Sequence, residues 1–429
     1  MIFFDSLKQD LEIVEKSRIF TLRVTIWLMI MQRLSSTGTL AAAVSDLILG
    51  CGKDLLEPCK RVLEWKISAS TGAYSQARQR LPEQAARRVA ERTFEQLRAM
   101  APRIGLRDRL FLLDGSSVRL ASSPAVLKAY PAAENQTGPT HWPVARIAVA
   151  HHVVTGLAMA PYFGPMYGPN AVSEQALSAE LIDRLPADSV LIADRNFGVF
   201  SVVWRAHSGG HQVLVRMTTP RANCLKHCPE DLKAGTAIRV VWEPTAATRR
   251  AHPGLPADAR IEGTLITAKP DGAAETLYLF TTLPVPPAEV VLLYKERWNI
   301  ETDLRSLKGQ VRLETLTAKS PLLVATELLM AVASYNIVRA IIGKVAQQAG
   351  MDPRRISFSR SRELFSAFTT TAANLTSEED FNRLWKVLLR GIAQCKLPKR
   401  NRPPQKREVW HKPQPFPFRK MPTIEKNKN

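Results

Sequence analysis

Apolar residues recur at helical spacing through the first hundred residues of the chain. The runs at 22–34 and 86–100 place apolar side chains three and four residues apart. This spacing predicts helices that bury one face against a core. We therefore expect residues 1–105 to form an N-terminal helical domain.

Beyond residue 106 the pattern changes to short apolar runs typical of strands, alternating with helical segments. Strands are predicted at 109–114, 145–154, 156–165, 189–194 and 211–218, and helices at 173–185 and 201–208. The second and third strands read as a hairpin that turns near Thr155 and Gly156. This order favours an α/β fold with a mixed sheet and helices on its faces.

Residues 219–286 differ again, because three alternating runs at 237–244, 260–269 and 276–283 are separated by loops rich in Pro and Gly. They predict a β insertion within an α/β domain at 106–345. From Pro287 a long helical pattern returns and runs to about residue 345. A C-terminal helical region is expected at 346–395, followed at 396–429 by a basic, Pro-rich tail that is disordered or ordered only on a partner.

The charge of the chain indicates the partner. The 429 residues carry 59 Lys plus Arg against 39 Asp plus Glu, a formal net charge of +20. Such an excess favours a polyanion, either nucleic acid or an anionic membrane surface. The apolar runs at 19–31 and 321–343 are interrupted by charged residues, so neither provides the roughly 20 uncharged residues of a membrane span. The acidic N-terminus is unlike a secretory signal. We therefore expect a cytoplasmic protein that binds nucleic acid.

A short helix near residue 75 is one candidate for that contact. Ser68 or Ser70 is suited to cap it, and it carries Gln76, Arg78 and Arg80. These side chains could contact DNA, or they could form an ordinary solvated helix face. The pattern alone favours neither interpretation.

The five cysteines form an odd, scattered set that fits a reducing compartment. Cys224, His227 and Cys228 have the residue types of zinc ligands, but no second Cys/His pair follows at ligand spacing. Free thiols in a loop are the alternative.

Two acids follow buried strands. Asp114 comes after the run Phe-Leu-Leu, and Asp194 after Val-Leu-Ile-Ala. A carboxylate at the end of a buried strand is costly unless it is paired, hydrogen-bonded or bound to a metal. Each acid alone could be a turn residue, but together with a third they indicate a metal site.

The third acid is Glu301, in a predicted helix that also carries Tyr294, Arg297 and Lys308. At about 100° per residue these four side chains fall within a stripe roughly 60° wide. Arg305 lies beside them. A salt-bridged surface face is the alternative, although such a face has no need of a tyrosine.

The pattern Y-x2-R-x3-E-x6-K formed by these four residues resembles the signature of bacterial insertion-sequence DDE transposases of the insertion-sequence-four (IS-four) family. The sequences Asp114-Gly115-Ser116 and Ala193-Asp194-Arg195 resemble the first and second acid motifs of that family. The resemblance extends over about residues 20–420. It departs mildly from the family pattern at Leu304, where Phe is frequent, and at Arg305, where Lys is common.

The resemblance implies a ribonuclease-H-like catalytic core with a β-strand insertion. It also implies that Asp114, Asp194 and Glu301 are catalytic and hold two Mg²⁺ ions, for which Mn²⁺ can substitute. Such a site hydrolyses one DNA strand and later joins the freed 3′-hydroxyl to target DNA, which is cut-and-paste transposition. Tyr294, Arg297, Lys308 and Arg305 would bind DNA phosphates.

The resemblance further implies a homodimer on paired DNA ends that recognises terminal inverted repeats and target DNA on the bacterial nucleoid. As the apolar runs already indicate, we expect no membrane partner. Trp242 could stack on an unpaired base, or it could be a core residue. Two other functions stay open: a catalytically silent, transposase-derived DNA-binding protein, and a ribonuclease-H-like nuclease without strand transfer.

Overall fold

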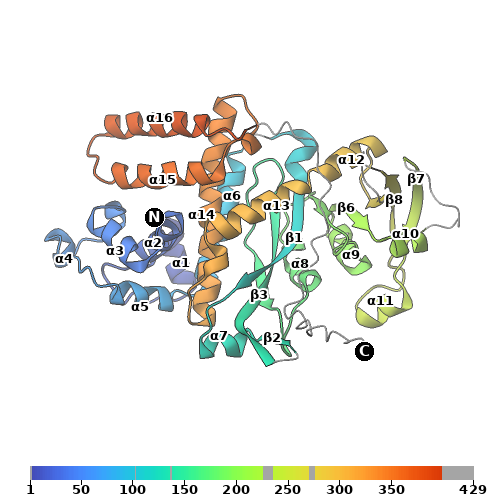
Figure 1. Ribbon diagram of the computed structural model, residues 1–429, viewed down its shortest axis with the longest axis horizontal. Coiled ribbons are helices and arrows are strands. Elements are labelled where there is room, and N and C mark those ends of the chain that lie inside the picture. The colour runs from blue at the N-terminus through green and yellow to red at the C-terminus, as the bar shows by residue number, and fades with distance from the viewer. Residues whose placement is uncertain (1, 102, 136–137, 226–234, 270–275, 399–429) are drawn as a thin grey trace, which may run out of the picture. The chain divides into compact units, whose positions relative to one another are not determined.

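The computed structural model describes residues 2–101, 103–135, 138–225, 235–269 and 276–398. The described residues up to Lys396 form one compact unit. Most of the predicted basic tail, at 396–429, lies outside the described residues. The fold is mixed α/β, with one sheet and many helices (Figure 1).

The sheet has nine strands in the described part of the chain, in the order β2-β3-β1-β5-β6-β9-β8-β7, and β4 pairs with β3 off this path. β1 is antiparallel to β3 and parallel to β5, which is parallel to β6. The strands are β1 (Leu110–Arg119), β2 (Ala132–Asn135), β3 (Gly138–His152), β4 (Tyr162–Pro165), β5 (Val190–Ala193), β6 (Gln212–Met217), β7 (Ala237–Trp242), β8 (Ile261–Ala268) and β9 (Leu277–Thr281).

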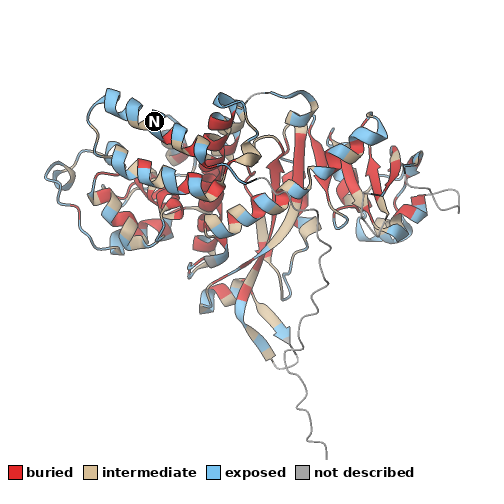
Figure 2. Ribbon diagram, turned by 45° about the horizontal axis from the view of Figure 1, so that its top comes forward, coloured by how far each residue is buried: buried red, intermediate tan, exposed pale blue. Residues whose placement is uncertain are grey.

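Alternation along the strands gives this sheet two apolar faces. Leu110 and Leu112 of β1 belong to a core cluster that includes the helices after β9, whereas Phe111 and Leu113 belong to a second cluster with α8 (Glu174–Ile182) and α9 (Phe200–Ser208). Because neighbouring side chains of a strand point to opposite faces, continuous apolar runs are buried on both sides. The central strands are buried almost throughout (Figure 2).

The predicted β insertion forms strands, and these strands extend the same sheet. β9 pairs antiparallel with β6, β8 pairs with β9, and β7 pairs with β8. Two short helices, α10 (Thr219–Leu225) and α11 (Ala246–Ala251), accompany them. The insertion therefore shares the hydrophobic core of the α/β part.

The predicted hairpin turn is confirmed. β3 ends at His152, and the chain returns so that His151 forms a bridge with Ala158. Gly156 has φ +69°, and a Cβ there would meet the guanidinium of Arg339 at 2.2–2.6 Å. Glycine is thus required at this turn both for its left-handed backbone and for the close approach of Arg339.

The first hundred residues are helical, as predicted. Thr21 caps the longest early apolar run, α2, by accepting a hydrogen bond from the Val24 backbone N–H. The helices here are α1 (Ile2–Asp10), α2 (Leu22–Leu34), α3 (Leu40–Ile48), α4 (Lys60–Leu63), α5 (Gly72–Arg80) and α6 (Glu83–Ala99), with 3₁₀ turns η1 (Lys53–Leu55) and η2 (Gly105–Arg109). A further helix, α7 (Pro124–Ala129), follows β1.

Helix α14 (Pro321–Gln348) contacts both α2 and α6. By length and composition it could cross a membrane, but 78% of its most apolar window is buried inside the protein. Packing against the N-terminal helices and the sheet explains its apolar character. After it come η5 (Pro353–Arg355), α15 (Phe358–Ala372) and α16 (Glu378–Gln394), where a C-terminal helical region is predicted.

The short helix α5 differs from its prediction. Arg78 is 6% exposed and pairs with Glu327 of α14, which also accepts a hydrogen bond from Arg33. Arg78 therefore joins α5 to α14 and is not available to DNA. The N-cap is Thr71, which makes no side-chain cap hydrogen bond, but the predicted Ser70 accepts the backbone N–H of Gly72, the first residue of the helix, at 3.3 Å.

Candidate active site

The two acids follow the paired segments of adjacent parallel strands, Asp114 within β1 and Asp194 directly after β5. Leu112 is opposite Ile192 in the register of β1 and β5, and both belong to the core cluster that contains residues of α14. Side chains alternate along a strand. Asp114 and Asp194, two residues further on, are therefore expected to share that face.

β1 continues beyond Asp114, although the sequence predicted that the strand ends there. Its antiparallel pairing with β3 runs from Phe111 to Arg119, whereas its parallel pairing with β5 stops at Leu113. Asp114 thus stands where the parallel neighbour ends. An apolar run indicates where a strand is buried on both faces. It does not indicate how far the strand continues when only one neighbouring strand remains hydrogen-bonded to it.

Burial dominates the electrostatics of Asp114 and raises the pKa of its carboxyl from 3.8 to about 6. A hydrogen bond from the Gly115 backbone N–H, 2.8 Å long, opposes this rise. The negative charges of Asp194 and Glu174 raise the pKa further, and the positive charge of Arg297 lowers it. The Asp114 carboxylate is therefore buried beside other acids, where a bound cation would stabilise it.

Asp194 begins a tight turn. Its Oδ1 accepts the backbone N–H of Asn196 at 2.8 Å, which is an Asx-type contact. Arg221 stabilises the same loop, because its guanidinium donates hydrogen bonds to the carbonyls of Arg195 and Gly198, at 3.0 and 3.1 Å. The loop that carries the second acid is thus held by side chains as well as by the sheet.

Glu301 lies on a helix beside β1. It lies on α13 (Trp298–Arg305), which packs against β1. Arg297 Nη2 lies 3.3 Å from Glu301 Oε1, and the same guanidinium lowers the pKa of Asp114. The structure therefore brings Glu301 and Arg297 to the edge of the sheet that carries the two aspartates.

Tyr294 also lies near these charged residues. Its side chain is buried, and burial raises the pKa of its phenol to about 12. Arg297 and Arg216 act against this rise, and Asp194 reinforces it. The phenol keeps its proton and can donate a hydrogen bond.

The predicted long helix is broken, so the single stripe of four side chains is wrong in detail. α12 (Pro287–Lys295) ends before Arg297, and the turn between α12 and α13 has tighter hydrogen bonds, such as that from Arg297 N to Tyr294 O. A π-helical turn, η3 (Ser306–Gln310), follows α13, and a short 3₁₀ turn, η4 (Leu313–Thr315), comes next. Apolar periodicity does not detect such local over- and underwinding.

Lys308 lies in the π-helical turn. Its Nζ pairs with Glu314 Oε1 at 3.1 Å. Arg305, the last residue of α13, is exposed. Among the four predicted phosphate-binding residues, Tyr294 and Arg297 are therefore the two whose charges and hydrogen bonds connect them to the acids.

The donors of the site have the chemistry of a hard-metal site, because carboxylate oxygens are the ligands that Mg²⁺ prefers. Within the described residues, however, no group of three or more His, Cys, Asp or Glu side chains is arranged to hold a metal ion. Glu301 is engaged with Arg297 instead. The acids share one edge of the sheet without converging on a common point.

Sequence reasoning missed Glu174. This residue is the first of α8, and its Oε2 accepts the Asn196 side-chain amide at 2.6 Å. A Cβ on Gly115 would meet Glu174 Cδ at 2.1 Å, so the carboxyl group lies directly against the backbone beside Asp114. The sequence offers only a serine cap followed by Glu, an ordinary start of a helix.

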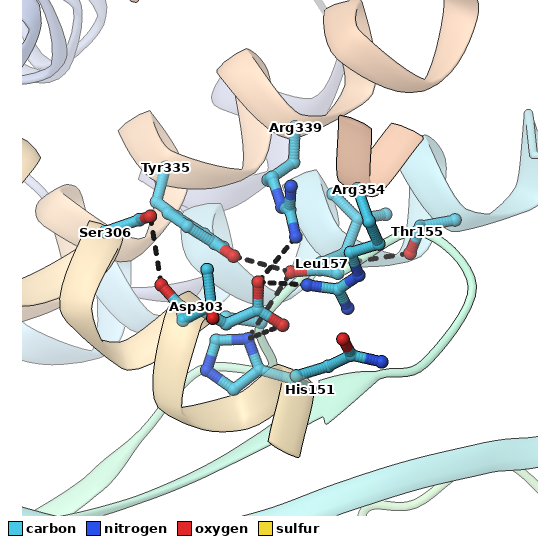
Figure 3. Close-up of polar contacts among 12 residues, drawn as sticks. His151, Thr155, Leu157, Asp303, Ser306, Tyr335, Arg339 and Arg354 are labelled. Atoms are coloured by element: carbon cyan, nitrogen blue, oxygen red, sulfur yellow. Dashed lines mark hydrogen bonds and ion pairs between the residues drawn. The ribbon is translucent and has the colours of Figure 1, made fainter. Parts of the chain in front are cut away.

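A buried ionic network fixes the opposite side of α13 (Figure 3). Asp303 lies two residues after Glu301, about 200° around the helix, and accepts hydrogen bonds from Arg339 and Arg354. Burial opposes the ionisation of Asp303, but the two guanidinium groups outweigh it and lower its pKa. Arg354 also donates to the Val153 carbonyl at 3.1 Å. The helix that carries Glu301 is thereby joined to α14 and to the β3–β4 turn.

Two other predicted functional features, Trp242 and the Cys224 cluster, do not join this site in the described residues. Trp242 is 8% exposed and packs edge-on against Phe200 and Phe280, which makes it a core residue. The exposed Cys224 has a free thiol. Its two predicted partners, His227 and Cys228, lie outside the described residues.

The chain is similar to known transposases. A family model described as "Transposase DDE domain" matches residues 105–337. The chain is 26% identical, over 299 residues, to "Transposase InsG for insertion sequence element IS4" of Escherichia coli (strain K12); the match covers 67% of this chain and 65% of that protein. A solved structure, the piggyBac transposase synaptic complex with hairpin DNA, is 11% identical with a TM-score of 0.36 and covers 70% of this chain and 59% of that one.

Proposed function

The chain belongs to the transposase DDE domain family, and from that premise we propose that it is a cut-and-paste DNA transposase of an insertion sequence. It would cleave phosphodiester bonds at the ends of the element and join the freed 3′-hydroxyl groups to target DNA. What supports the proposal is that β1 and β5 are adjacent parallel strands whose paired segments end directly before Asp114 and Asp194, and that β1 packs against the helix of Glu301.

The order of the strands supports a ribonuclease-H-like core. β4, β3 and β1 form an antiparallel meander, and β5 and β6 continue it in parallel to β1. In this proposal β7, β8 and β9 are the insertion between the second and third acids. Parallel strands place their carboxyl ends at one edge, where open α/β sheets bind ligands.

The donor set fits divalent metal. Asp114 is a buried carboxyl whose pKa is raised by burial and by neighbouring acids, and a cation would remove that penalty. We propose that Asp114, Asp194 and Glu301 hold two Mg²⁺ ions, for which Mn²⁺ can substitute. When bound, such ions activate the attacking water or 3′-hydroxyl and stabilise the leaving oxygen.

The residues of the chain perform the remaining tasks. Arg297 presents two donors to a phosphate, and the neutral phenol of Tyr294 donates to a phosphate oxygen. Because Arg297 now pairs with Glu301, DNA would draw the guanidinium onto its phosphate and release the Glu301 carboxylate. In this way the arrival of DNA would complete the acid set.

DNA binding follows from the charge. At a formal net charge of +20, phosphate contacts dominate affinity and make it depend steeply on salt. We propose that the N-terminal helices and the basic tail bind terminal inverted repeats and target DNA, that two copies assemble on paired ends, and that this occurs on the bacterial nucleoid in the cytoplasm.

A catalytically silent DNA-binding derivative is the second candidate. The open arrangement of acids within the described residues favours it. A duplex that carries the end of the element separates the two functions when it is incubated with Mg²⁺ and either wild type or Glu301→Gln. Cleavage by wild type alone, with equal DNA binding by both, supports the transposase. Binding without cleavage by wild type supports the silent derivative.

A further inference from the structure

Glu174 reaches the active site from the face of the sheet opposite to the two aspartates. Gly115 lies two residues after Leu113 of β1 and therefore on the same face of the strand. The Leu113 side chain belongs to the cluster that contains Leu177 and Leu181 of α8. The position of Cβ at Gly115 would overlap the Glu174 carboxyl, with Oε1 at 2.4 Å and Cγ at 2.5 Å. Glu174 therefore supports β1 from behind.

The same carboxyl group holds the loop of the second acid. Asn196 donates its side-chain amide to Glu174 Oε2 at 2.6 Å, and Gln175 donates to the Asn196 carbonyl at 2.7 Å. The Asn196 backbone N–H in turn donates to Asp194. A short chain of contacts thus runs from the start of α8 through Asn196 to Asp194.

We infer that Glu174 is a positioning residue that sets the separation of Asp114 and Asp194 by bridging Gly115 and Asn196. This inference rests on the proposed function. Glu174 is not assigned as a ligand, because it lies behind the strand, with Oε1 against Gly115 and Oε2 accepting from Asn196. Partners behind metal ligands typically change metal affinity 10- to 100-fold when they are removed.

The experiment measures Mn²⁺ binding to the full chain by electron paramagnetic resonance, with melting temperature recorded in parallel. Glu174→Ala is expected to weaken Mn²⁺ binding at least about tenfold. Glu174→Gln retains an oxygen that accepts from Asn196 and should stay within about threefold of wild type. Glu180→Ala, on the same helix, is the matched control and should bind like wild type.

Asn196→Ala removes the other partner of the Glu174–Asn196 hydrogen bond. It replaces Glu174→Ala in the Mn²⁺ measurement if that variant does not fold. It should weaken Mn²⁺ binding as Glu174→Ala does, and the double variant should be no weaker than either one, because both remove the same contact. Additive losses would overturn the bridge. So would wild-type affinity in Glu174→Ala, or equal losses in Glu174→Ala and Glu174→Gln, which would assign the effect to charge.

Failure of the inference is distinguishable from failure of the proposed function. If wild type binds no Mn²⁺ and does not cleave DNA, the transposase proposal fails. If wild type does both and Glu174→Ala matches it in both, the transposase proposal stands and the positioning role of Glu174 is refuted.

Discussion

Replacing Asp114 by Asn should stabilise the metal-free protein at neutral pH while abolishing activity. The pKa of Asp114 is raised from 3.8 to about 6, mainly by burial. The folded protein thus holds this proton more tightly than the unfolded chain does. Asp114 imposes no penalty below pH 3.8, and the penalty grows until the pH passes about 6.

The size of the effect follows from the two pKa values. At about 1.4 kcal/mol for each pH unit between them, the full penalty is about 3 kcal/mol. Asn keeps the side-chain oxygen that accepts the Gly115 N–H but is neutral at every pH. Asp114→Asn should therefore exceed wild type in unfolding free energy by about 3 kcal/mol at pH 7.5, and by only about 0.6 kcal/mol at pH 4.

Urea denaturation in EDTA, followed by tryptophan fluorescence from pH 4 to 8, measures this difference. Asp54→Asn, at an exposed acid on η1, controls for the loss of one negative charge and should show no such pH dependence. Added Mg²⁺ should stabilise wild type and leave Asp114→Asn unchanged. A difference between wild type and Asp114→Asn that is constant with pH would refute the reasoning.

Three further predictions concern stability. Glu327→Leu leaves Arg33 and Arg78 buried without their partner and should lower the unfolding free energy by about 3–5 kcal/mol in urea; a loss under 1 kcal/mol would contradict the burial of these charges. Trp242→Ala should lower it by about 3–5 kcal/mol and leave DNA affinity in gel shifts unchanged, whereas weaker DNA binding at full stability would identify a stacking residue. Burial lowers the pKa of His151 from 6.5 to about 4. The unfolded chain therefore takes up this proton first, and wild type should lose stability as pH falls from 6.5 to 4. His151→Gln should flatten that part of the stability profile, and an unchanged profile would contradict the prediction.

The strand acids could be predicted because burial on both faces leaves a continuous apolar run, and an acid directly after such a run is conspicuous. Asp114 and Asp194 were found in this way. The register that makes them neighbours could not be read, since it depends on pairing between segments about 80 residues apart. Glu174 was missed for the same reason, because its importance comes from contacts with Gly115 and Asn196 and not from its own sequence neighbourhood.

Charged residues were the least predictable. Arg78 looks like part of a solvated basic face, but its partner Glu327 is 249 residues away and both are buried. The break between α12 and α13 was also hidden, because a 3₁₀ or π turn shifts side chains without disturbing the apolar pattern. Periodicity therefore located the helix of Glu301 but not the orientation of Lys308.

The central claim is that Asp114, Asp194 and Glu301 hold metal together, and iron-directed cleavage of the protein tests it most directly. Fe²⁺ that occupies the site, given ascorbate and peroxide in the presence of DNA ends, generates radicals that cut the nearby backbone. Cuts close to all three acids, suppressed by excess Mg²⁺, are the predicted result. Cuts at the two aspartates that never include α13, or cuts unaffected by Mg²⁺, would contradict the three-acid site.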